Sequence, residues 1–376
     1  MPPGALPPPP LLVAPDAFKG TLPARRVAQA IARGIRRAGG SPADVCPVAD
    51  GGEGTLDILV DALGGRLVPF EASDPLGRPV AARYALLAPD ERAPRARGPR
   101  GRGAAPTAIV EVADASGLGR LAEAERDPVG SSTAGTGELI AEAVRSGARE
   151  VVVAAGGSAT TDGGAGAIAA IAAGGGLRGA SLTVLCDVRT PFELAAQRFG
   201  PQKGARDSAT VRLLTGRLEG LARGWPRDPR GVPMTGAAGG LAGGLWATLG
   251  ARLEPGAPFV LGAIGFESRL RSARAVVVGE GRLDHGTLEG KAPAEVAVRA
   301  RQLGVPAHAI VGVNRLDPFD ARLLDLGLIL EAGDEPSLER AGRTLARCIE
   351  DGAERGSAKP APGGSRSRGR PRRYAR

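Results

Sequence analysis

Short apolar runs followed by glycine-rich polar loops recur along the chain. Residues 11–14, 45–48, 151–155 and 275–278 form such runs, and each is followed by a loop that contains glycine. A continuous apolar run of this length predicts a strand that is buried on both faces, as in a parallel sheet. Helical spacing of apolar residues resumes after these loops. The pattern therefore predicts repeated strand–loop–helix units.

The stretch 151–166 has the most pronounced pattern of this kind. Its strand ends at Gly156 and Gly157, and a small polar segment with Ser158, Thr160 and Asp162 leads into an Ala-rich helix. Such a turn directs several backbone N–H groups and the positive end of a helix at one point. The stretch therefore predicts an anion site of the kind that holds phosphate.

The pattern changes in the middle of the chain and returns near its end. Strands dominate from residue 66 to residue 112, whereas the last third restores the alternation of strands and helices. We therefore expect an α/β protein with two domains. One domain is discontinuous and comprises residues 1–71 plus 278–351. Residues 72–277 form a second, mixed α/β domain inserted into it, and residues 352–376 form a disordered basic tail.

The positive charge of the chain is concentrated in two segments. The net charge is +9, of which the segment 352–376 carries +7 and the segment 92–102 carries +5, which leaves −3 for the rest. Both segments are rich in Pro, Gly, Ser or Ala, as solvated loops and tails are. This distribution argues against a nucleic-acid-binding protein, although a basic arm at the tail is the alternative.

Cysteine usage and hydropathy predict the compartment. Cys46, Cys186 and Cys348 are far apart in the chain and form no metal-binding pair. The sequence contains no signal-peptide pattern and no apolar run long enough to span a membrane. We therefore expect a cytoplasmic protein without a membrane segment. The oligomeric state stays open, with a homodimer among the options.

The loops after the strands bring one set of charged residues to one edge of the sheet. They supply Lys19, Asp50, Glu53 and Asp187, and then Glu280, Arg282 and Asp284. Lysine and loop N–H groups can hold phosphates, and carboxylates can hold Mg²⁺ or accept a hydroxyl proton, so this combination favours a kinase. Turn chemistry alone explains many single Asp and Gly residues in loops, and only their convergence favours function.

Standard nucleotide motifs are weak or absent. The chain lacks G-x-x-x-x-G-K-[ST], and residues 164–169 fit G-x-G-x-x-A only inside a predicted helix. A further observation concerns lysine, because only four of the 49 Lys and Arg residues are lysines. Three of them, Lys19, Lys203 and Lys291, lie next to glycine. Such a chain could retain lysine where a compact ammonium is required, with chance as the alternative.

Seven motifs occur together in a fixed order across roughly residues 11–350. They are APDAFKGTLPA (14–24), VADGGEGT (48–55), GGSATTDGGAG (156–166), CDV (186–188), FGPQKGA (199–205), GAAGGLAGGL (236–245) and GEGRLDHGTLEGKAP (279–293). This series resembles the motifs of the bacterial type I glycerate kinases. The resemblance implies ATP-dependent, Mg²⁺-assisted phosphorylation of D-glycerate, most often on the 2-hydroxyl. It also implies that the discontinuous domain is flavodoxin-like and that the active site lies in the cleft between the two domains.

The resemblance also suggests roles for individual residues. Asp187 and Asp284 compete for the role of the base that accepts the hydroxyl proton, with a slight preference for Asp187 because it follows a buried strand. Lys19 is a candidate for both catalysis and phosphate binding. Asp50, Glu53 and Asp162 are candidates for the metal. The other expected substrate- and phosphate-binding residues are Gly20, Gly156, Gly157, Ser158, Thr160, Arg282 and Lys291.

The segment 167–185 departs from the family pattern. It is a short Ala/Gly-rich link where the family has a longer segment. This supports an alternative function, a catalytically weakened homologue that acts as a small-molecule-binding or regulatory protein. The Arg-rich segment 92–102, the basic tail and Thr190-Pro191 after the CDV motif also depart from the family pattern.

Overall fold

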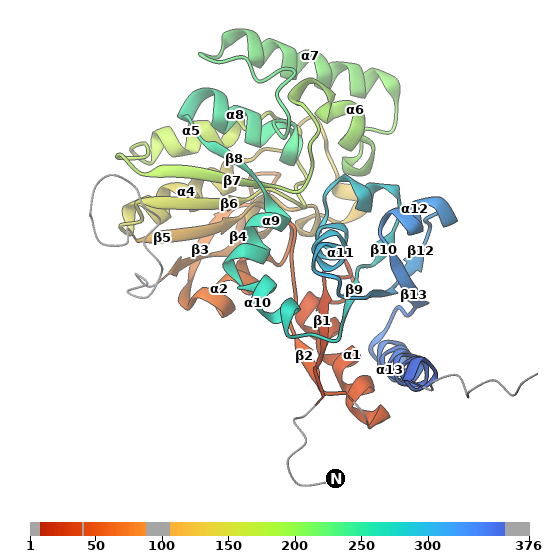
Figure 1. Cartoon of the computed structure of the whole chain (residues 1–376). Coiled ribbons are helices and arrows are strands. Elements are labelled where there is room, and N and C mark those ends of the chain that lie inside the picture. Colours follow the sequence, from red (N-terminus) through yellow and green to blue (C-terminus); the bar gives the residue numbers. More distant parts are fainter. Residues whose placement is uncertain (1–7, 40, 88–105, 358–376) are drawn as a thin grey trace, which may run out of the picture.

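A computed structural model describes the chain at residues 8–39, 41–87 and 106–357 (Figure 1). Two large β-sheets form its framework, one of five strands and one of six. Helices lie on both faces of each sheet, which confirms the predicted α/β class. The predicted Arg-rich loop at 92–102 lies outside the described residues.

The five-stranded sheet is entirely parallel and is built from the two ends of the chain. Its strands are β1 (Leu11–Pro15), β2 (Ala43–Val45), β9 (Ala275–Gly279), β11 (Ala307–Val311) and β13 (Leu326–Glu331). Across the sheet they follow the order β13-β11-β9-β1-β2. Numbered along the chain, this is the order 2-1-3-4-5 of flavodoxin-like folds. The flavodoxin-like, discontinuous sheet is therefore confirmed.

Side chains of the central strands alternate between two helical layers, as strand geometry requires. Leu11 and Val13 pack with α1 (Ala24–Ala38) and α13 (Glu335–Ser357) on one face. Leu12 and Ala14 pack on the other face with α10 (Phe266–Arg271) and α11 (Ala292–Leu303). Both faces are thus covered, which explains why the central strands β1 and β9 are continuous apolar runs.

The six-stranded sheet is mixed and has the order β3-β4-β5-β6-β7-β8. Its strands are β3 (Gly65–Ser73), β4 (Pro79–Leu87), β5 (Thr107–Glu111), β6 (Glu150–Ala154), β7 (Ser181–Cys186) and β8 (Arg252–Pro255). β3, β4 and β5 pair antiparallel, whereas β5 to β8 are parallel. The strand predicted at 151–155 is β6, and it is buried in the parallel half.

Helices cover both faces of this second sheet. Apolar residues of α4 (Ala134–Arg145), α5 (Ala165–Ala173) and α8 (Leu241–Leu249) pack on one face. α2 (Thr55–Leu63) and α9 (Gly256–Ala263) pack on the other face, and α9 also contacts the core of the first sheet. α2 and α9 therefore lie between the two sheets.

Shorter elements complete the described chain. α6 (Ala195–Phe199) and α7 (Ser208–Gly224) form a cap with its own small core around Phe192. The remaining elements are α3 (Val112–Ser116), α12 (Pro318–Leu323), β10 (Arg282–Leu283), β12 (Val313–Asn314), and the 3₁₀ helices η1 (Leu118–Arg120), η2 (Glu123–Glu125), η3 (Phe192–Leu194), η4 (Pro201–Lys203), η5 (Ala237–Gly240) and η6 (His285–Glu289).

Three predicted boundaries need correction. The boundary at 277/278 falls inside β9, which pairs with β1 from Ala275 to Gly279. The boundary expected near Glu71 falls inside β3, which pairs with β4 along its whole length and so belongs to the six-stranded sheet. The tail expected from residue 352 begins later, because α13 continues to Ser357. Extending an existing helix by a turn costs little free energy, which explains this continuation. Residues 358–376 lie outside the described residues.

The glycine-dense segment 236–244 makes close backbone contacts with the loop after β6. A Cβ atom on Gly239 would lie 1.9 Å from the Thr160 carbonyl oxygen, and one on Gly244 would lie 2.2 Å from that of Gly163. Only glycine permits this approach, which joins the start of α8 to the loop.

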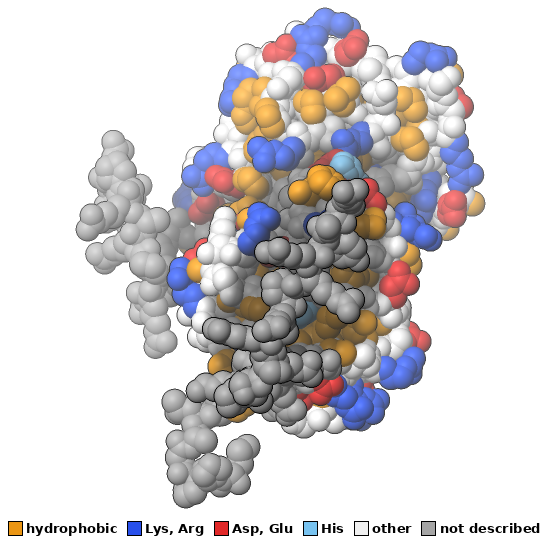
Figure 2. All heavy atoms as spheres, turned by 45° about the vertical axis from the view of Figure 1, so that its right-hand side comes forward, with side chains coloured by type: hydrophobic (Ala, Val, Ile, Leu, Met, Phe, Trp, Pro, Cys, Tyr) orange, Lys and Arg blue, Asp and Glu red, His pale blue; other side chains and the backbone are white. Residues whose placement is uncertain are grey.

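Two features of the described residues concern the predicted absence of a membrane segment and of a concentrated basic surface. No helix in residues 8–39, 41–87 or 106–357 combines the length and apolar character that a membrane span needs. On the face in Figure 2, Lys and Arg side chains are interspersed with Asp and Glu side chains. All three cysteines are free thiols.

Candidate active site

The carboxyl ends of β1 and β9 meet where the strand order of the five-stranded sheet reverses. The backbone N–H of Asp16, just after β1, donates to the Gly279 carbonyl at 2.8 Å. Ligands of open α/β sheets bind at such a switch point. The loops that begin there carry Lys19 and Glu280, so the fold places both at the ligand edge.

Glycines bring the edge of the second sheet against this point. Gly156 donates its N–H to the Gly51 carbonyl at 3.1 Å. A Cβ atom on Gly156 would lie 2.4 Å from the Gly52 Cα and 3.0 Å from Asp187 Oδ2. A larger residue would separate these loops. The absence of side chains at Gly52 and Gly156 therefore places Asp187, at the end of β7, beside the loops of the first sheet.

We refer to the place where the loops of the two sheets touch as the seam. Lys19 and Asp50 meet there, as their places after two parallel strands predicted. The Lys19 ammonium lies 3.9 Å from Asp50 Oδ2, and the charge of Asp50 raises the Lys19 pKa above its ordinary value. Asp50 is buried. Its Oδ1 accepts from the Gly52 N–H at 3.1 Å, whereas its buried Oδ2 has no hydrogen-bond partner among the described residues.

Buried carboxyl groups outnumber the cations at this seam. Burial and the charge of Asp50 raise the pKa of Asp187 and Lys19 lowers it, which together bring this pKa to about 6. Burial likewise raises the pKa of Asp16 well above its ordinary range. Burial also raises the pKa of Glu280 to about 7. Strongly perturbed carboxyl groups that share a cleft are typical of catalytic sites.

The segment after β9 holds its charged residues in different environments. Thr287 donates its hydroxyl to Glu280 Oε1 at 2.6 Å, and the Lys291 ammonium lies 3.9 Å from Glu280 Oε2. Asp284 Oδ1 accepts the Gly286 N–H at 2.9 Å and so caps η6. Arg282 is exposed on β10. The cap role of Asp284 favours Asp187 over it as the base.

Asp162 does not fit the metal role expected from the sequence. Its Oδ2 accepts from the Thr133 N–H and hydroxyl and from the Gly166 N–H, and its Oδ1 accepts from the Gly164 N–H, at 2.8–3.1 Å. The carboxylate therefore satisfies the N–H groups at the start of α5. An external phosphate cannot use these same N–H groups, so the anion-site hypothesis does not hold for this helix end.

Lys203 is a buried residue beside the loop after β6 that the expected binding residues did not include. Its ammonium donates to Ser158 Oγ at 2.9 Å and to the Thr160 carbonyl oxygen at 2.6 Å. The Thr160 hydroxyl is buried and has no hydrogen-bond partner among the described residues. Ser158 is thus held by a lysine rather than turned towards open space. The scarcity of lysine in the sequence was the available signal.

Glu111 is the second residue that sequence reasoning missed. It ends β5, and its carboxylate accepts the Gly54 N–H at 3.0 and 3.1 Å and the Leu56 N–H at 3.0 Å. It therefore caps α2 from the neighbouring sheet, and burial raises its pKa to about 7. No local pattern marks a carboxylate whose partners lie more than fifty residues away.

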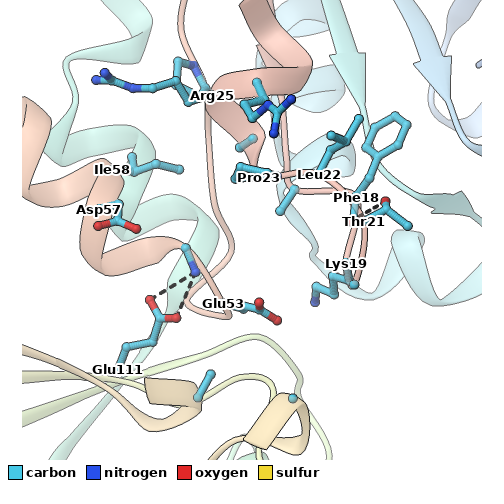
Figure 3. A pocket seen from close by; sticks show the side chains of 18 of the residues that line it. Phe18, Lys19, Thr21, Leu22, Pro23, Arg25, Glu53, Asp57, Ile58 and Glu111 are labelled. Carbon is cyan, nitrogen blue, oxygen red and sulfur yellow. Dashed lines mark hydrogen bonds between the residues drawn. The ribbon is translucent and has the colours of Figure 1, made fainter. Parts of the chain in front are cut away.

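A cavity of about 740 Å³ lies beside Lys19, between the loop after β1 and the start of α2 (Figure 3). Gly20, Phe18 and Leu22 line it on one side, and Glu53 and Ile58 on the other. The backbone of Gly20 has a φ of 78°, and a Cβ there would meet no atom within 4 Å. A volume of this size suits a ligand as large as a nucleotide.

Two of the three expected metal ligands, Asp50 and Glu53, lie at the seam or beside the adjacent cavity. Among the described residues, no group of three or more His, Cys, Asp or Glu side chains could hold a metal ion by itself. Mg²⁺ in phosphate-transfer sites usually takes one or two carboxylates together with substrate phosphates. The buried Oδ2 of Asp50, which has no hydrogen-bond partner among the described residues, fits such a ligand, and Glu53 lines the adjacent cavity.

Comparison with known proteins identifies relatives over nearly the whole chain. The model of the glycerate kinase family matches residues 11–176 and 173–355. A glycerate kinase of Halalkalibacterium halodurans is 34% identical over 89% of this chain and 97% of its own length. A glycerate 2-kinase of Escherichia coli K12 is 33% identical over 91% of this chain and 98% of its own length.

A solved structure agrees with these sequence relatives. It is described as a glycerate kinase 2 from Salmonella typhimurium LT2, and it superposes with a TM-score of 0.70 at 31% identity. The match covers 92% of this chain and 99% of that protein. The predicted resemblance and the observed architecture thus agree.

Proposed function

The chain belongs to the glycerate kinase family, and we propose that it transfers the γ-phosphoryl group of ATP to the 2-hydroxyl of D-glycerate. The observation that carries this proposal is the position of the Lys19 ammonium. It lies between a nucleotide-sized cavity and a group of buried carboxyl groups. Phosphoryl transfer requires this combination of a cation for phosphate and a carboxylate for the acceptor hydroxyl.

The cavity beside Lys19 is the proposed nucleotide site. Glycerate is a three-carbon acid and would fill only a small part of about 740 Å³. Phe18, Leu22 and Ile58 offer apolar surface for a base, whereas Lys19 lies where phosphates would meet the seam. We place ATP in this cavity, with Gly20 allowing close backbone approach.

Asp187 is the proposed base. The glycerate 2-hydroxyl oxygen forms the new bond to the γ-phosphorus, and the bond from that phosphorus to the bridging oxygen of ADP breaks. Asp187 accepts the hydroxyl proton and later releases it to water. A pKa of about 6 leaves the carboxylate ionised at neutral pH and still able to accept a proton.

Other residues bind substrate and metal in this proposal. Lys291 and Arg282 lie on the segment after β9 and would contact the glycerate carboxylate, and Gly156 and Gly157 would shape the floor. Asp50 and Glu53 would hold Mg²⁺, which neutralises phosphate charge when it is bound. Asp162 is left out because its oxygens are satisfied by protein donors.

The strand pairing after the short link that follows α5 favours an active enzyme over a weakened homologue. The chain closes this link within residues 174–180, and β7 pairs with β6 from Ser181 to Leu185. Asp187 therefore follows a strand that is held in register on both sides. These strand contacts support an active enzyme. The proposed small-molecule substrates and the free thiols support a cytoplasmic location.

A turnover assay tests the proposal directly. Purified protein is mixed with ATP, MgCl₂ and D-glycerate, ADP release is followed, and phosphorus NMR separates 2-phosphoglycerate from 3-phosphoglycerate. We expect 2-phosphoglycerate. Lys19→Ala is the variant expected to lose activity, and Arg206→Met, which removes an exposed cation of the cap, is its matched control. Nucleotide binding without ADP release would favour the binding-protein alternative, and 3-phosphoglycerate would refute the 2-hydroxyl assignment.

A further inference from the structure

Lys203 is buried although it carries a charge. It ends the short helix η4 in the cap, and only 3% of its surface is exposed. Lysine is almost never buried to this degree unless its ammonium is paired. An apolar side chain of similar size would fill the same space without the cost of desolvating a charge. The presence of an ammonium here therefore calls for an explanation.

The ammonium joins the cap to the loop after β6. It holds the Ser158 hydroxyl at 2.9 Å and the Thr160 carbonyl at 2.6 Å. Between these two residues, Ala159 donates its N–H to the Ser116 carbonyl at 2.9 Å. The loop is thus held from the cap by Lys203 and from the sheet side by the backbone of α3.

This loop is directly coupled to the seam. It begins at Gly156, the residue that abuts Gly52 and the Asp187 carboxylate. A shift of Ser158 by a fraction of an ångström would move Gly156 against groups that have no free space. Close-packed contacts transmit such displacements rather than absorb them.

The charge of Lys203 also faces the seam. Burial lowers its pKa to about 8, while the negative charges of Asp162 and Asp187 act in the opposite direction. The side chain therefore stays mostly protonated at neutral pH. In return, its positive charge, like that of Lys19, favours the ionised form of Asp187.

We propose that Lys203 is a positioning residue for phosphoryl transfer: it fastens the Ser158–Thr160 loop so that Gly156 and Asp187 keep their places at the seam. The inference rests on the proposed function. Arginine is not an equivalent replacement, since its planar guanidinium presents its donors in a fixed fork, whereas lysine has a compact ammonium. This explains why a chain rich in arginine retains lysine at this position.

The test compares five variants with the wild type in the D-glycerate assay: four single variants and the double variant Lys203→Met/Ser158→Ala. Lys203→Met removes the hydrogen bonds and the charge, Lys203→Gln keeps a polar donor, and Ser158→Ala removes one acceptor. Arg206→Met is the matched control, because it removes an exposed cation three residues along the same cap. Thermal unfolding and the KM values for ATP and D-glycerate are measured for each variant.

We expect a loss of kcat with little change in binding. Lys203→Met should lower kcat roughly 10- to 100-fold, because small misplacements of reacting groups have effects of this size. Both KM values should stay within about threefold of the wild type, since a positioning role acts on the transition state. Ser158→Ala should lower kcat less than Lys203→Met does, and the kcat of the double variant should be no lower than that of Lys203→Met. Arg206→Met should retain wild-type kcat.

Two results would overturn the inference. One is a folded Lys203→Met protein with wild-type kcat. The other, which decides the matter if Lys203→Met does not fold, is wild-type kcat in both Lys203→Gln and Ser158→Ala. Failure of the proposed function is distinct, because the wild type itself would then release no ADP with D-glycerate.

Discussion

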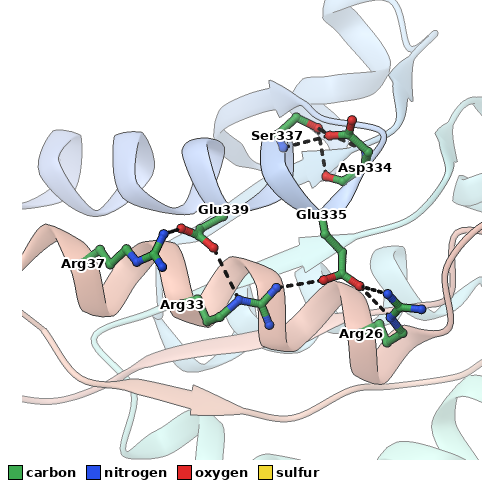
Figure 4. A network of polar contacts seen from close by, with 7 residues as sticks. All are labelled: Arg26, Arg33, Arg37, Asp334, Glu335, Ser337 and Glu339. Atoms are coloured by element: carbon green, nitrogen blue, oxygen red, sulfur yellow. Dashed lines mark hydrogen bonds and ion pairs between the residues drawn. The ribbon is translucent and has the colours of Figure 1, made fainter.

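Two groups of charged residues in this protein have opposite properties. One joins α1 to α13, where Arg26 and Arg33 pair with Glu335, and Arg33 and Arg37 pair with Glu339 (Figure 4). The other is the seam, where Lys19 faces Asp50 at 3.9 Å. The first has an arginine for each carboxylate, whereas the second has more buried carboxyl groups than cations.

Solvent explains the difference between the two groups. The arginines on α1 are 38–64% exposed, and the pKa of Glu335 lies below its ordinary range because Arg26 and Arg33 pair with it. At the seam, Asp50 is 2% exposed, and the pKa values of Asp187 and Glu280 are raised by burial. Burial and charge imbalance, rather than the number of ion pairs, distinguish a reactive site from a solvated network.

The backbones of the two helices approach each other closely. A Cβ atom on Gly34 of α1 would lie 2.0 Å from the Glu339 carbonyl oxygen, and one on Gly342 would lie 2.4 Å from the Ile31 carbonyl oxygen. A groove of about 410 Å³ beside these helices is lined by their charged side chains. The groove is therefore explained by the packing of the two helices and needs no ligand to account for it.

The largest expected effect is at the seam. Lys19→Ala should lower kcat/KM for D-glycerate phosphorylation on the order of 10³-fold, because it removes the cation that we propose meets the transferred phosphoryl group. Steady-state kinetics measure the loss, with circular dichroism as the test of folding. Activity within tenfold of the wild type would show that the cation is dispensable and that the seam is not the site.

A somewhat smaller loss is expected at Asp187. Asp187→Asn should lower kcat roughly 10²- to 10³-fold, as loss of a general base does. The wild-type kcat should be full above about pH 6 and fall as the pH drops through that value, because the base must be ionised. The residual activity of the variant should lack this acidic limb. If the variant kept the same fall of kcat at acidic pH, that fall would have to come from the titration of another group.

The helix pair should respond in stability rather than in activity. Gly34→Ala should destabilise the fold by about 3 kcal/mol, since the new methyl group meets a backbone carbonyl that cannot move aside. Urea unfolding measures this. Gly216→Ala in α7 is the control, because its Cβ meets no atom within 4 Å and helix propensity alone should make it neutral or stabilising. Equal effects of the two variants would contradict the close-packing account.

The smallest effect is expected for the exposed network. Glu335→Gln should shift Tm by no more than about 2 °C, since exposed ion pairs contribute little and are screened by salt. Because pairing lowers the pKa of Glu335, its small contribution is present at neutral pH and is lost as the pH falls through that lowered value. Differential scanning calorimetry at two salt concentrations and two pH values measures it. A shift as large as that of Gly34→Ala would remove the contrast between the two regions.

The sequence alone determined the local order of the fold. Continuous apolar runs predicted β1, β6 and β9, and the glycine-rich loops after them predicted the edge where Lys19 and Asp50 meet. Such features depend on whether each residue is buried and on which conformation its backbone adopts. Both leave periodic patterns over a few residues, so they can be read without knowledge of distant contacts.

Only the tertiary structure decided which polar groups act on one another. Asp162 is satisfied by Thr133, Glu111 caps α2 from another sheet, and Lys203 reaches Ser158 from the cap. These partners are 29 to 55 residues apart in the chain. A carboxylate in a loop has the same sequence pattern whether it meets a metal ion or a helix end. Its role is set by the donors that packing brings within hydrogen-bond distance, which no local pattern encodes.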